Sequence, residues 1–214
     1  MIKFENVDVW GFQHAIRGMR NPMNSWEFSD STYEGEVKLG CNDRDLMSKL
    51  IKAGQSHRKF LRQIFVSVDI IAPLYWWKEF DTYKVGTVAN SCSTMHQIHA
   101  REFSIDDFSC EHLLHVPIPG KVYSPKAMME TTVSNLNMLR DMFRISKDKE
   151  WWWQMIQLLP SSYNQKRTVT MTYENLLNML EHRRDHKLDE WRDFCNWILT
   201  LPLSHLLSEG IEQK

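Results

Sequence analysis

The stretch from Pro160 to Arg192 constrains the fold more than any other part of the chain. It opens on a Leu-Pro break, continues through a polar turn and becomes one amphipathic segment. Helical spacing places Asn178, Arg183 and Lys187 near one stripe of that segment, and we expect the stripe to bind an anion. A guanidinium stays charged at any workable pH, so a buried one needs a ligand, an acid or water as its partner.

Length and composition are those of an ordinary globular protein. The chain has 214 residues, of which 43% are hydrophobic and 25% charged. Such values are typical of one well-filled domain, so we expect a single domain over residues 1–214. The formal net charge of −1 gives no overall attraction to nucleic acid.

Four dispersed cysteines, Cys41, Cys92, Cys110 and Cys195, form no CxxC pair and follow no secretory leader. This pattern predicts free thiols in a reducing compartment, and we expect a cytoplasmic protein. No metal site is expected, because the histidines and cysteines are spaced loosely and lack a second matching pair. No apolar run reaches the roughly 18 residues of a membrane helix, so no membrane span is expected.

The order of elements predicts an α+β fold, with strands early and helices late. We expect strands within residues 2–12 and 60–73, and polar loops at residues 17–37 and 84–97. Asp43, Arg44 and Asp45 are expected to cap the first helix. Apolar spacing places the helices at residues 45–54, 75–83, 126–145, 149–159, 174–185 and 189–207.

Four short motifs occur in a distinctive order: Ala72-Pro73, the Asn90 and Ser93 pair, Leu159-Pro160, and residues 178–185. In this order the chain resembles the flavin-dependent thymidylate synthases, the ThyX family, over roughly residues 43–96 and 150–200. The resemblance implies a mixed sheet with helices and FAD bound at the interfaces of a homotetramer. It also implies methylation of dUMP with methylenetetrahydrofolate and a nicotinamide reductant such as NADPH.

The resemblance also assigns roles to individual residues. Arg183 falls on the arginine that holds and polarises the uracil ring, which would make it the catalytic residue. Asn178 and His57 fall on residues beside the flavin. The full set of expected site residues is Arg183 for catalysis; His57, Lys84, Asn90, Asn178 and Lys187 for the flavin; and Ser93 and Arg167 for a pyrimidine nucleotide.

The family's signature, Arg-His-Arg-x-x-Ser-x-Asn-Glu-x-Ser-x-Arg-Tyr, is only partly matched by residues 83–96. An ungapped alignment keeps Asn90 and Ser93, whereas a one-residue shift before Val88 places Lys84 on the basic triplet. One phosphate-binding arginine of the family falls on Met95 and another near residues 154–157. Each missing charge pair costs about 1.5 to 3 kcal/mol, or one to two orders of magnitude in phosphate affinity. Other cations could replace them: Lys166, Arg167, Arg17, Arg20, Arg184 and Lys187 are candidates.

Three further interpretations remain open. The chain could be a diverged homologue without synthase activity that binds nucleotides or proteins. A nucleic-acid binder is weaker, given the net charge; it would use Arg17, Arg20, Lys166, Arg167, Arg183 and Arg184. A Cys92 and His96 nucleophilic pair is weaker still.

Trp151 to Trp153 point in three directions on one helix, which favours core packing plus a subunit contact.

Overall fold

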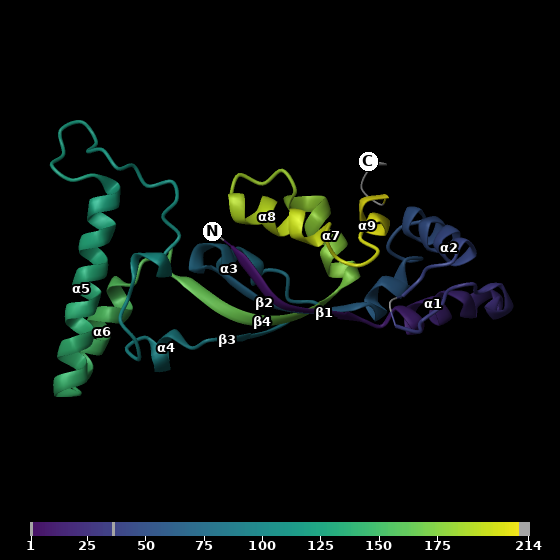
Figure 1. Cartoon of the computed structure of the whole chain (residues 1–214), viewed down its shortest axis with the longest axis horizontal. Coiled ribbons are helices and arrows are strands. Elements are labelled where there is room, and N and C mark those ends of the chain that lie inside the picture. The colour runs from purple at the N-terminus through teal and green to yellow at the C-terminus, as the bar shows by residue number, and fades with distance from the viewer. Residues whose placement is uncertain (1, 36, 210–214) are drawn as a thin grey trace. The chain divides into compact units, whose positions relative to one another are not determined.

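The computed structural model describes residues 2–35 and 37–209. A four-stranded antiparallel sheet has the order β1-β2-β4-β3 (Figure 1). Its strands are β1 (Lys3–Trp10), β2 (Phe65–Pro73), β3 (Val88–Ser91) and β4 (Asn164–Thr172). Backbone hydrogen bonds from Leu74 to Tyr163 and from Tyr173 to Ile64, both 3.0 Å, fix the register of β2 against β4.

Nine α-helices occur in the described part of the chain, and about half of the chain is helical. The predicted α+β class is therefore confirmed. No helix of the described residues has both the length and the apolar character that a membrane crossing requires. The helices are α1 (Phe12–Arg20), α2 (Cys41–Lys52), α3 (Leu74–Phe80), α4 (Thr94–Gln97), α5 (Pro125–Ser146), α6 (Lys149–Leu158), α7 (Tyr173–Arg183), α8 (Asp189–Ile198) and α9 (His205–Glu209).

The chain divides into two compact units, and every strand contributes residues to both. Unit 1 comprises residues 1–3, 70–82 and 90–167, and unit 2 comprises residues 4–69, 83–89 and 168–214. The expectation of a single domain over residues 1–214 stays a prediction.

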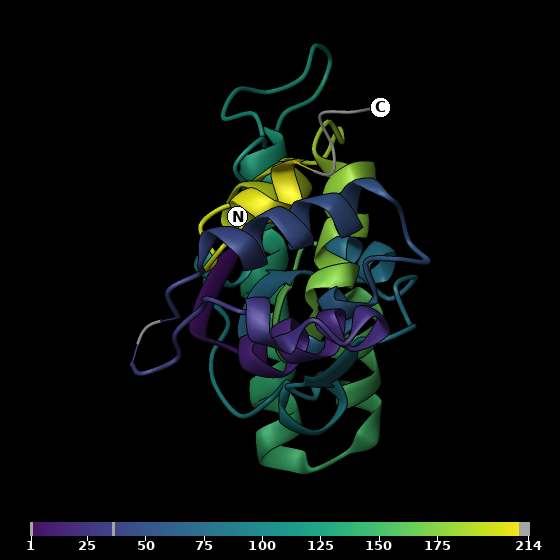
Figure 2. The same cartoon turned by 90° about the vertical axis from the view of Figure 1, so that its right-hand side faces the viewer.

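Unit 2 is built around α7, which packs against α8 and α9 (Figure 2). Trp191 and Phe194 of α8 are fully buried and meet edge to face, with their ring centroids 5.7 Å apart. Tyr173 at the start of α7 is also buried, and its hydroxyl donates to the Pro202 carbonyl. These large rings fill the core and so set the position of α7.

A buried ion pair ties α1 to α2 within unit 2. Arg20 Nε lies 2.7 Å from Asp43 Oδ1, and the two side chains are 5% and 0% exposed. Asp43 also accepts hydrogen bonds from the Ser29 and Ser31 hydroxyls. Burial alone would raise the pKa of Asp43, but the hydrogen bonds from Ser31, Arg20, Ser29 and the Asp30 backbone together lower it. The expected cap was wrong: α2 begins at Cys41, and Asp43 neutralises Arg20 instead.

Unit 1 contains the helical pair α5 and α6, which lie side by side (Figure 1). Leu136 of α5 and Met155 of α6 are fully buried between them. Among the three tryptophans of α6, Trp153 is 49% exposed, whereas Trp152 donates from Nε1 to the Met95 carbonyl at 3.2 Å. Trp151 and Trp152 pack, partly buried, against the core that contains Leu136 and Met155, so the expected core packing is present, and the subunit contact stays a prediction.

Several predicted boundaries were wrong. The predicted loop at residues 84–97 contains β3 and α4, and residues 164–172 form β4 instead of a turn. The predicted loop at residues 17–37 begins inside α1, and Glu36 of that loop lies outside the described residues. The predicted helix over residues 189–207 is two helices, because the chain turns at residues 199–204 around Pro202.

Candidate functional site

A cavity of about 830 Å³ lies in unit 2. The end of α2 and the segment that follows it, the turn at Val85 and Gly86, and one side of α7 as far as Glu181 line it. Its polar lining is supplied by Lys52, Gln55, Arg58, Arg62, Thr172, Glu174, Asn175, Asn178 and Glu181. Amides and cations in one cavity suit a ligand that carries both ring heteroatoms and negative charge.

Two carboxylates of α7 hold Arg58 in the wall of this cavity. Arg58 Nε lies 3.2 Å from Glu174 Oε2, and its Nη1 lies 3.3 Å from Glu181 Oε1. All three side chains are only 10 to 11% exposed. Since these carboxylates neutralise Arg58, the exposed Lys52 and Arg62 are the lining cations that an anionic ligand meets first.

The turn at Gly86 is fitted closely to α7. Gly86 has a φ of +77°, and a Cβ there would come within 2.9 Å of Asn175 Oδ1. The same Asn175 donates from Nδ2 to the Val85 carbonyl at 2.7 Å. Glycine is required here both by the left-handed backbone and by the close approach of α7. The wall of the cavity is thereby fixed to the helix that carries Asn178.

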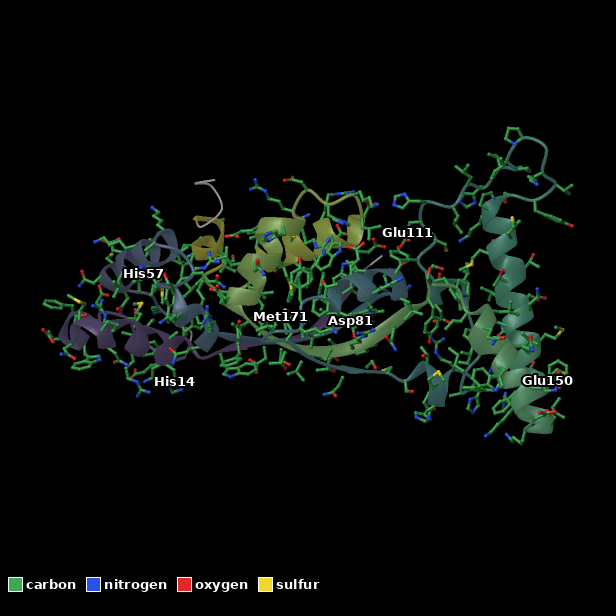
Figure 3. The ribbon with its side chains drawn as sticks, turned by 180° about the vertical axis from the view of Figure 1, so that it is seen from behind. His14, His57, Asp81, Glu111, Glu150 and Met171 are labelled. Carbon is green, nitrogen blue, oxygen red and sulfur yellow. The ribbon has the colours of Figure 1, made fainter. Side chains whose placement is uncertain are left out.

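Three of the predicted flavin residues lie in or next to this cavity. Asn178 lines it with an exposed side chain. His57 is exposed in the turn at residues 54–58, whose other members include lining residues (Figure 3). Lys84 is exposed and directly precedes the lining turn. Three residues that were predicted from the sequence thus lie around one cavity, although only Asn178 of the three lines it.

The other two predicted flavin residues lie elsewhere. Asn90 is an exposed residue of β3 in unit 1 and does not line the unit 2 cavity. Lys187 is exposed in the segment between α7 and α8. Because α7 ends at Arg183, the helical stripe that was expected to include Lys187 stops one turn earlier.

Arg183 is half-buried against aromatic rings of unit 2. Its Nε donates to the Tyr83 hydroxyl at 2.9 Å, and its guanidinium carbon lies 4.8 Å from the centroid of the Trp191 ring. The Tyr83 ring centroid is 5.6 Å away. Arg183 does not line the unit 2 cavity. Its predicted role toward a uracil ring stays a prediction.

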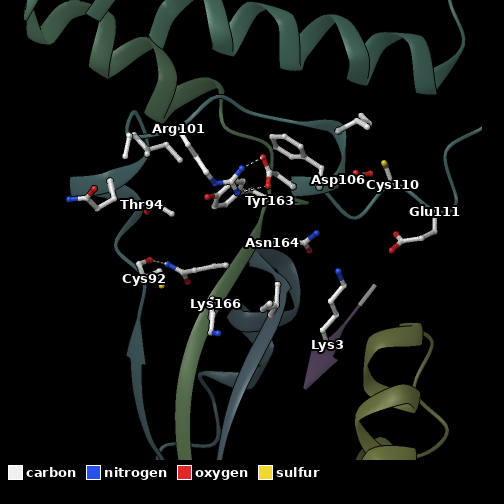
Figure 4. Close-up of a pocket in the computed structure, with 18 of the residues that line it drawn as sticks. Lys3, Cys92, Thr94, Arg101, Asp106, Cys110, Glu111, Tyr163, Asn164 and Lys166 are labelled. Carbon is white, nitrogen blue, oxygen red and sulfur yellow. Dashed lines mark hydrogen bonds and ion pairs between the residues drawn. The ribbon is translucent and has the colours of Figure 1, made fainter. Parts of the chain in front are cut away.

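A second cavity, of about 850 Å³, lies in unit 1 (Figure 4). Ser93 lines it and caps α4, where its hydroxyl accepts from the His96 backbone N–H at 3.2 Å. Thr94 and Gln97 of α4 and Asn164 at the start of β4 add further neutral polar groups. Such a set can donate to and accept from a polar heterocycle or sugar.

Of the charged residues that line the unit 1 cavity, only Lys166 was named from the sequence, as a candidate cation. Arg101 donates from Nη1 to Asp107 Oδ2 at 2.9 Å, and its side chain ends beside Tyr163 (Figure 4). Burial raises the pKa of the Tyr163 phenol, so its hydroxyl stays protonated at neutral pH. The alternating pattern of residues 164–172 indicates a strand and would have placed Tyr163 and Asn164, but we predicted a turn there. Arg101 carried no signal in the sequence.

Arg167, predicted to contact the substrate, is committed to its own neighbours in unit 1. Its Nη1 lies 2.7 Å from Asp81 Oδ1, and its Nε donates to Gln165 Oε1 at 2.9 Å. The guanidinium carbon lies 4.3 Å from the centroid of the Trp77 ring. Gln165 in turn donates to the Cys92 carbonyl at 2.9 Å. Arg167 does not line the cavity and instead organises the strands beside it.

Comparison with solved structures identifies proteins of the same fold. Thymidylate Synthase X (ThyX) from Helicobacter pylori with FAD and dUMP superposes with a TM-score of 0.70 at 17% identity, covering 100% of both chains. A second structure of that enzyme with FAD and dUMP gives 0.69 at 17% identity, covering 97% of this chain and 100% of that one. The UMP/dUMP methylase PolB from Streptomyces cacaoi, bound with 5-Br dUMP, gives 0.64 at 15% identity, covering 97% of this chain and 94% of that one.

Comparisons by sequence find nothing comparable. No protein-family model matches the chain, and no curated protein matches it. Identities of 15 to 17% establish similarity of fold and not of activity. The chain therefore has the fold of the flavin-dependent thymidylate synthases.

Proposed function

We propose that this protein binds FAD and acts on a pyrimidine nucleotide of the dUMP type, as a flavin-dependent methyltransferase. The unit 2 cavity would hold FAD and the unit 1 cavity would hold the nucleotide. FAD, when bound, supplies the redox chemistry, and methylenetetrahydrofolate and NADPH are the proposed co-substrates. A homotetramer and a cytoplasmic location belong to the same proposal.

One observation carries this assignment: Asn178, expected to contact the flavin, and Ser93, expected to contact the nucleotide, line two different cavities. Asn178 lines the unit 2 cavity, with His57 and Lys84 next to its lining, and Ser93 lines the unit 1 cavity. The solved structures that share the fold contain FAD with dUMP, or a dUMP analogue. The agreement between motif order, fold and cavity lining supports a flavoprotein.

The unit 2 cavity fits FAD chemically. Asn178 offers an amide donor and acceptor for ring heteroatoms, and Lys52 and Arg62 offer positive charge for the pyrophosphate. Its volume of about 830 Å³ falls in the range of cofactor sites. Arg58, already paired with two carboxylates, would orient the wall instead of binding the anion.

The direct test is the absorbance spectrum of the purified protein. We expect flavin bands in the protein as isolated or after addition of FAD, and dUMP binding measured by titration calorimetry. A protein that binds neither FAD nor dUMP would contradict the proposal. Mass spectrometry of copurified ligands identifies what occupies the cavities in the cell.

A second candidate function is a diverged homologue that binds nucleotide without catalysing methylation. The observation that favours it is Arg183, whose guanidinium lies over Trp191 and donates to Tyr83 instead of lining the unit 2 cavity. Complementation of a thymidine auxotroph separates the two candidates. Growth without thymidine would reject the inactive homologue, whereas ligand binding without growth would support it.

A further inference from the structure

The unit 1 cavity carries cationic side chains of two kinds. Arg101 is the arginine of its lining, and Lys3, Lys126 and Lys166 are the lysines. Arg101 is already neutralised by Asp107 and also donates to the Glu102 carbonyl. An arginine that is engaged in this way has little left to offer an incoming anion. The lysines are therefore the candidates for anion recognition.

Lys126 is the lysine whose surroundings favour an anion most. It is half-buried at the start of α5, and its Nζ contacts the thiol of Cys110 at 3.2 Å. Among the described residues no carboxylate pairs with it. An ammonium has three N–H donors, so one contact with a weak acceptor leaves two for a ligand in the cavity. A half-buried positive charge without a counter-ion is stabilised by a bound anion.

The donor at this position is the side chain and not the backbone of α5. The Lys126 N–H donates to the Leu114 carbonyl at 3.1 Å, and the Ala127 N–H donates to Ser124 Oγ at 3.1 Å. Lys3 lies at the start of β1, and its side chain points to the side of the cavity where Asn164 and Glu111 lie (Figure 4). Lys3 thus supplies a second ammonium to the same cavity.

The carboxylates of the cavity limit what the anion can be. Asp107 is committed to Arg101, while Asp106 and Glu111 also line the cavity. The four cationic side chains outnumber the three carboxylates, so a compact dianion is favoured near the lysines and disfavoured near Asp106. The neutral groups of α4 and β4 remain for the uncharged part of the ligand.

We infer that Lys126, together with Lys3, binds the phosphate of the nucleotide in the unit 1 cavity and so replaces the arginine that is absent at Met95. This inference rests on the proposed function. It assigns phosphate recognition in this chain to lysine, a point charge with rotatable donors, in place of the forked arginine contact.

The test compares dUMP with deoxyuridine, which differ only in the phosphate, by titration calorimetry on the full chain. Lys126→Ala should weaken dUMP binding about 10- to 100-fold and leave deoxyuridine binding unchanged. Lys126→Arg, which keeps the charge, should restore most of the preference for dUMP. Lys121→Ala is the matched control, because Lys121 is an exposed lysine of the preceding loop that does not line the cavity. Circular dichroism of each variant verifies that it is folded.

Alkylation of Cys110 by iodoacetamide gives a second readout of the same contact. A phosphate bound to Lys126 lies beside the Cys110 thiol, so dUMP should slow alkylation of Cys110 more than deoxyuridine does. Cys41 is exposed and belongs to unit 2, and its alkylation should not change. Cys195 should stay unmodified, because burial raises the pKa of its thiol to about 12.

The outcomes separate the inference from the proposed function. If the wild-type protein binds dUMP and Lys126→Ala binds it equally well, the lysine assignment fails and the proposed function stands. Equal losses for dUMP and deoxyuridine would also overturn the assignment, since they indicate a structural role. If the wild-type protein binds neither ligand, both proposals fall together.

Discussion

Arg20 and Arg167 show how the fold uses cations that look available in the sequence. Arg20 pairs with Asp43, 23 residues away, and Arg167 donates to Asp81, 86 residues away. Both were expected as candidates to replace the missing phosphate-binding arginines. Sequence spacing carries no information about such distant partners, whereas the fold brings them within hydrogen-bond distance. The half-buried Lys126 became a candidate only when its neighbours were known.

At the Arg20 and Asp43 pair we predict a large loss of stability on neutralising the acid. Asp43→Asn leaves the Arg20 charge buried without its partner, which should cost about 3 kcal/mol in the free energy of unfolding. Urea denaturation measures the change. Asp45→Asn is the control, since Asp45 is an exposed acid of the same helix, and it should change stability by less than about 0.5 kcal/mol. Equal effects of the two variants would contradict the role of the buried pair.

The same acid makes stability depend on pH. The hydrogen bonds to Asp43 hold its pKa in the folded protein below its ordinary value of about 3.9. Its contribution is therefore fully present above that pH and is lost as the pH falls through the folded-state pKa. Urea titrations at a series of acidic pH values should show a steeper loss of stability for the wild type than for Asp43→Asn. Parallel curves would contradict this assignment.

Arg183 allows a sharp test of the catalytic hypothesis. Arg183→Ala removes the hydrogen bond to Tyr83 and the contact with Trp191, which should cost about 1 to 2 kcal/mol of stability. If Arg183 also acts on the substrate, kcat/KM should fall more than roughly tenfold, which corresponds to a loss of more than about 1.4 kcal/mol of transition-state stabilisation. Arg184→Ala is the control, because Arg184 is 55% exposed and pairs with its neighbour Asp185. Unchanged kinetics in Arg183→Ala would remove the residue from the mechanism.

At the scale of elements, long segments with a helical period were predicted well and short polar strands were not. The helices at residues 126–145 and 149–159 correspond closely to α5 and α6. β4 was missed because its sequence, NQKRTVTMT, opens with four polar residues and then alternates threonine with only two apolar residues. Its buried side, which includes Val169 and Met171, follows the period of two expected of a strand with one covered face.

The turn before β3 gives a prediction at the level of an element. Gly86→Ala combines a strained backbone with a Cβ placed 2.9 Å from Asn175 Oδ1, and it should displace the turn from α7. We expect a loss of stability of about 1 to 3 kcal/mol and weaker FAD binding. Gly120→Ala is the matched control, because its φ of +79° is almost the same and a Cβ there meets nothing within 4 Å. Fluorescence titration with FAD and thermal denaturation measure both effects, and equal FAD affinity in the two variants would argue against this wall.

For the molecule as a whole, the order of motifs along the chain predicted the fold better than it predicted the residues of the site. The α+β class and the resemblance over residues 43–96 and 150–200 agree with solved structures of the same fold. The cavity linings depend on residues that the resemblance did not single out, such as Arg58, Arg101 and Lys126. These side chains meet through tertiary packing, which local sequence does not encode.

Ligand binding should also stabilise the whole chain. Free FAD at about 100 times its dissociation constant should add about 2.7 kcal/mol to the free energy of unfolding, because only the folded chain offers the cavity. A thermal shift that grows with FAD concentration measures this linkage. Adenosine, which lacks both flavin and pyrophosphate, is the control ligand and should give a smaller shift. A melting temperature independent of FAD would speak against a flavin site.

The order β1-β2-β4-β3 leaves β1 and β3 as the two borders of the sheet. An edge strand presents unpaired backbone N–H and C=O groups, to which a strand of another molecule can pair. Such pairing is the usual route to fibrils and precipitates. Here one border is only four residues long, and the other carries Lys3, Glu5 and Asp8 along its length. A short edge strand on one side and charged side chains along the other should disfavour aggregation of this protein in concentrated solution.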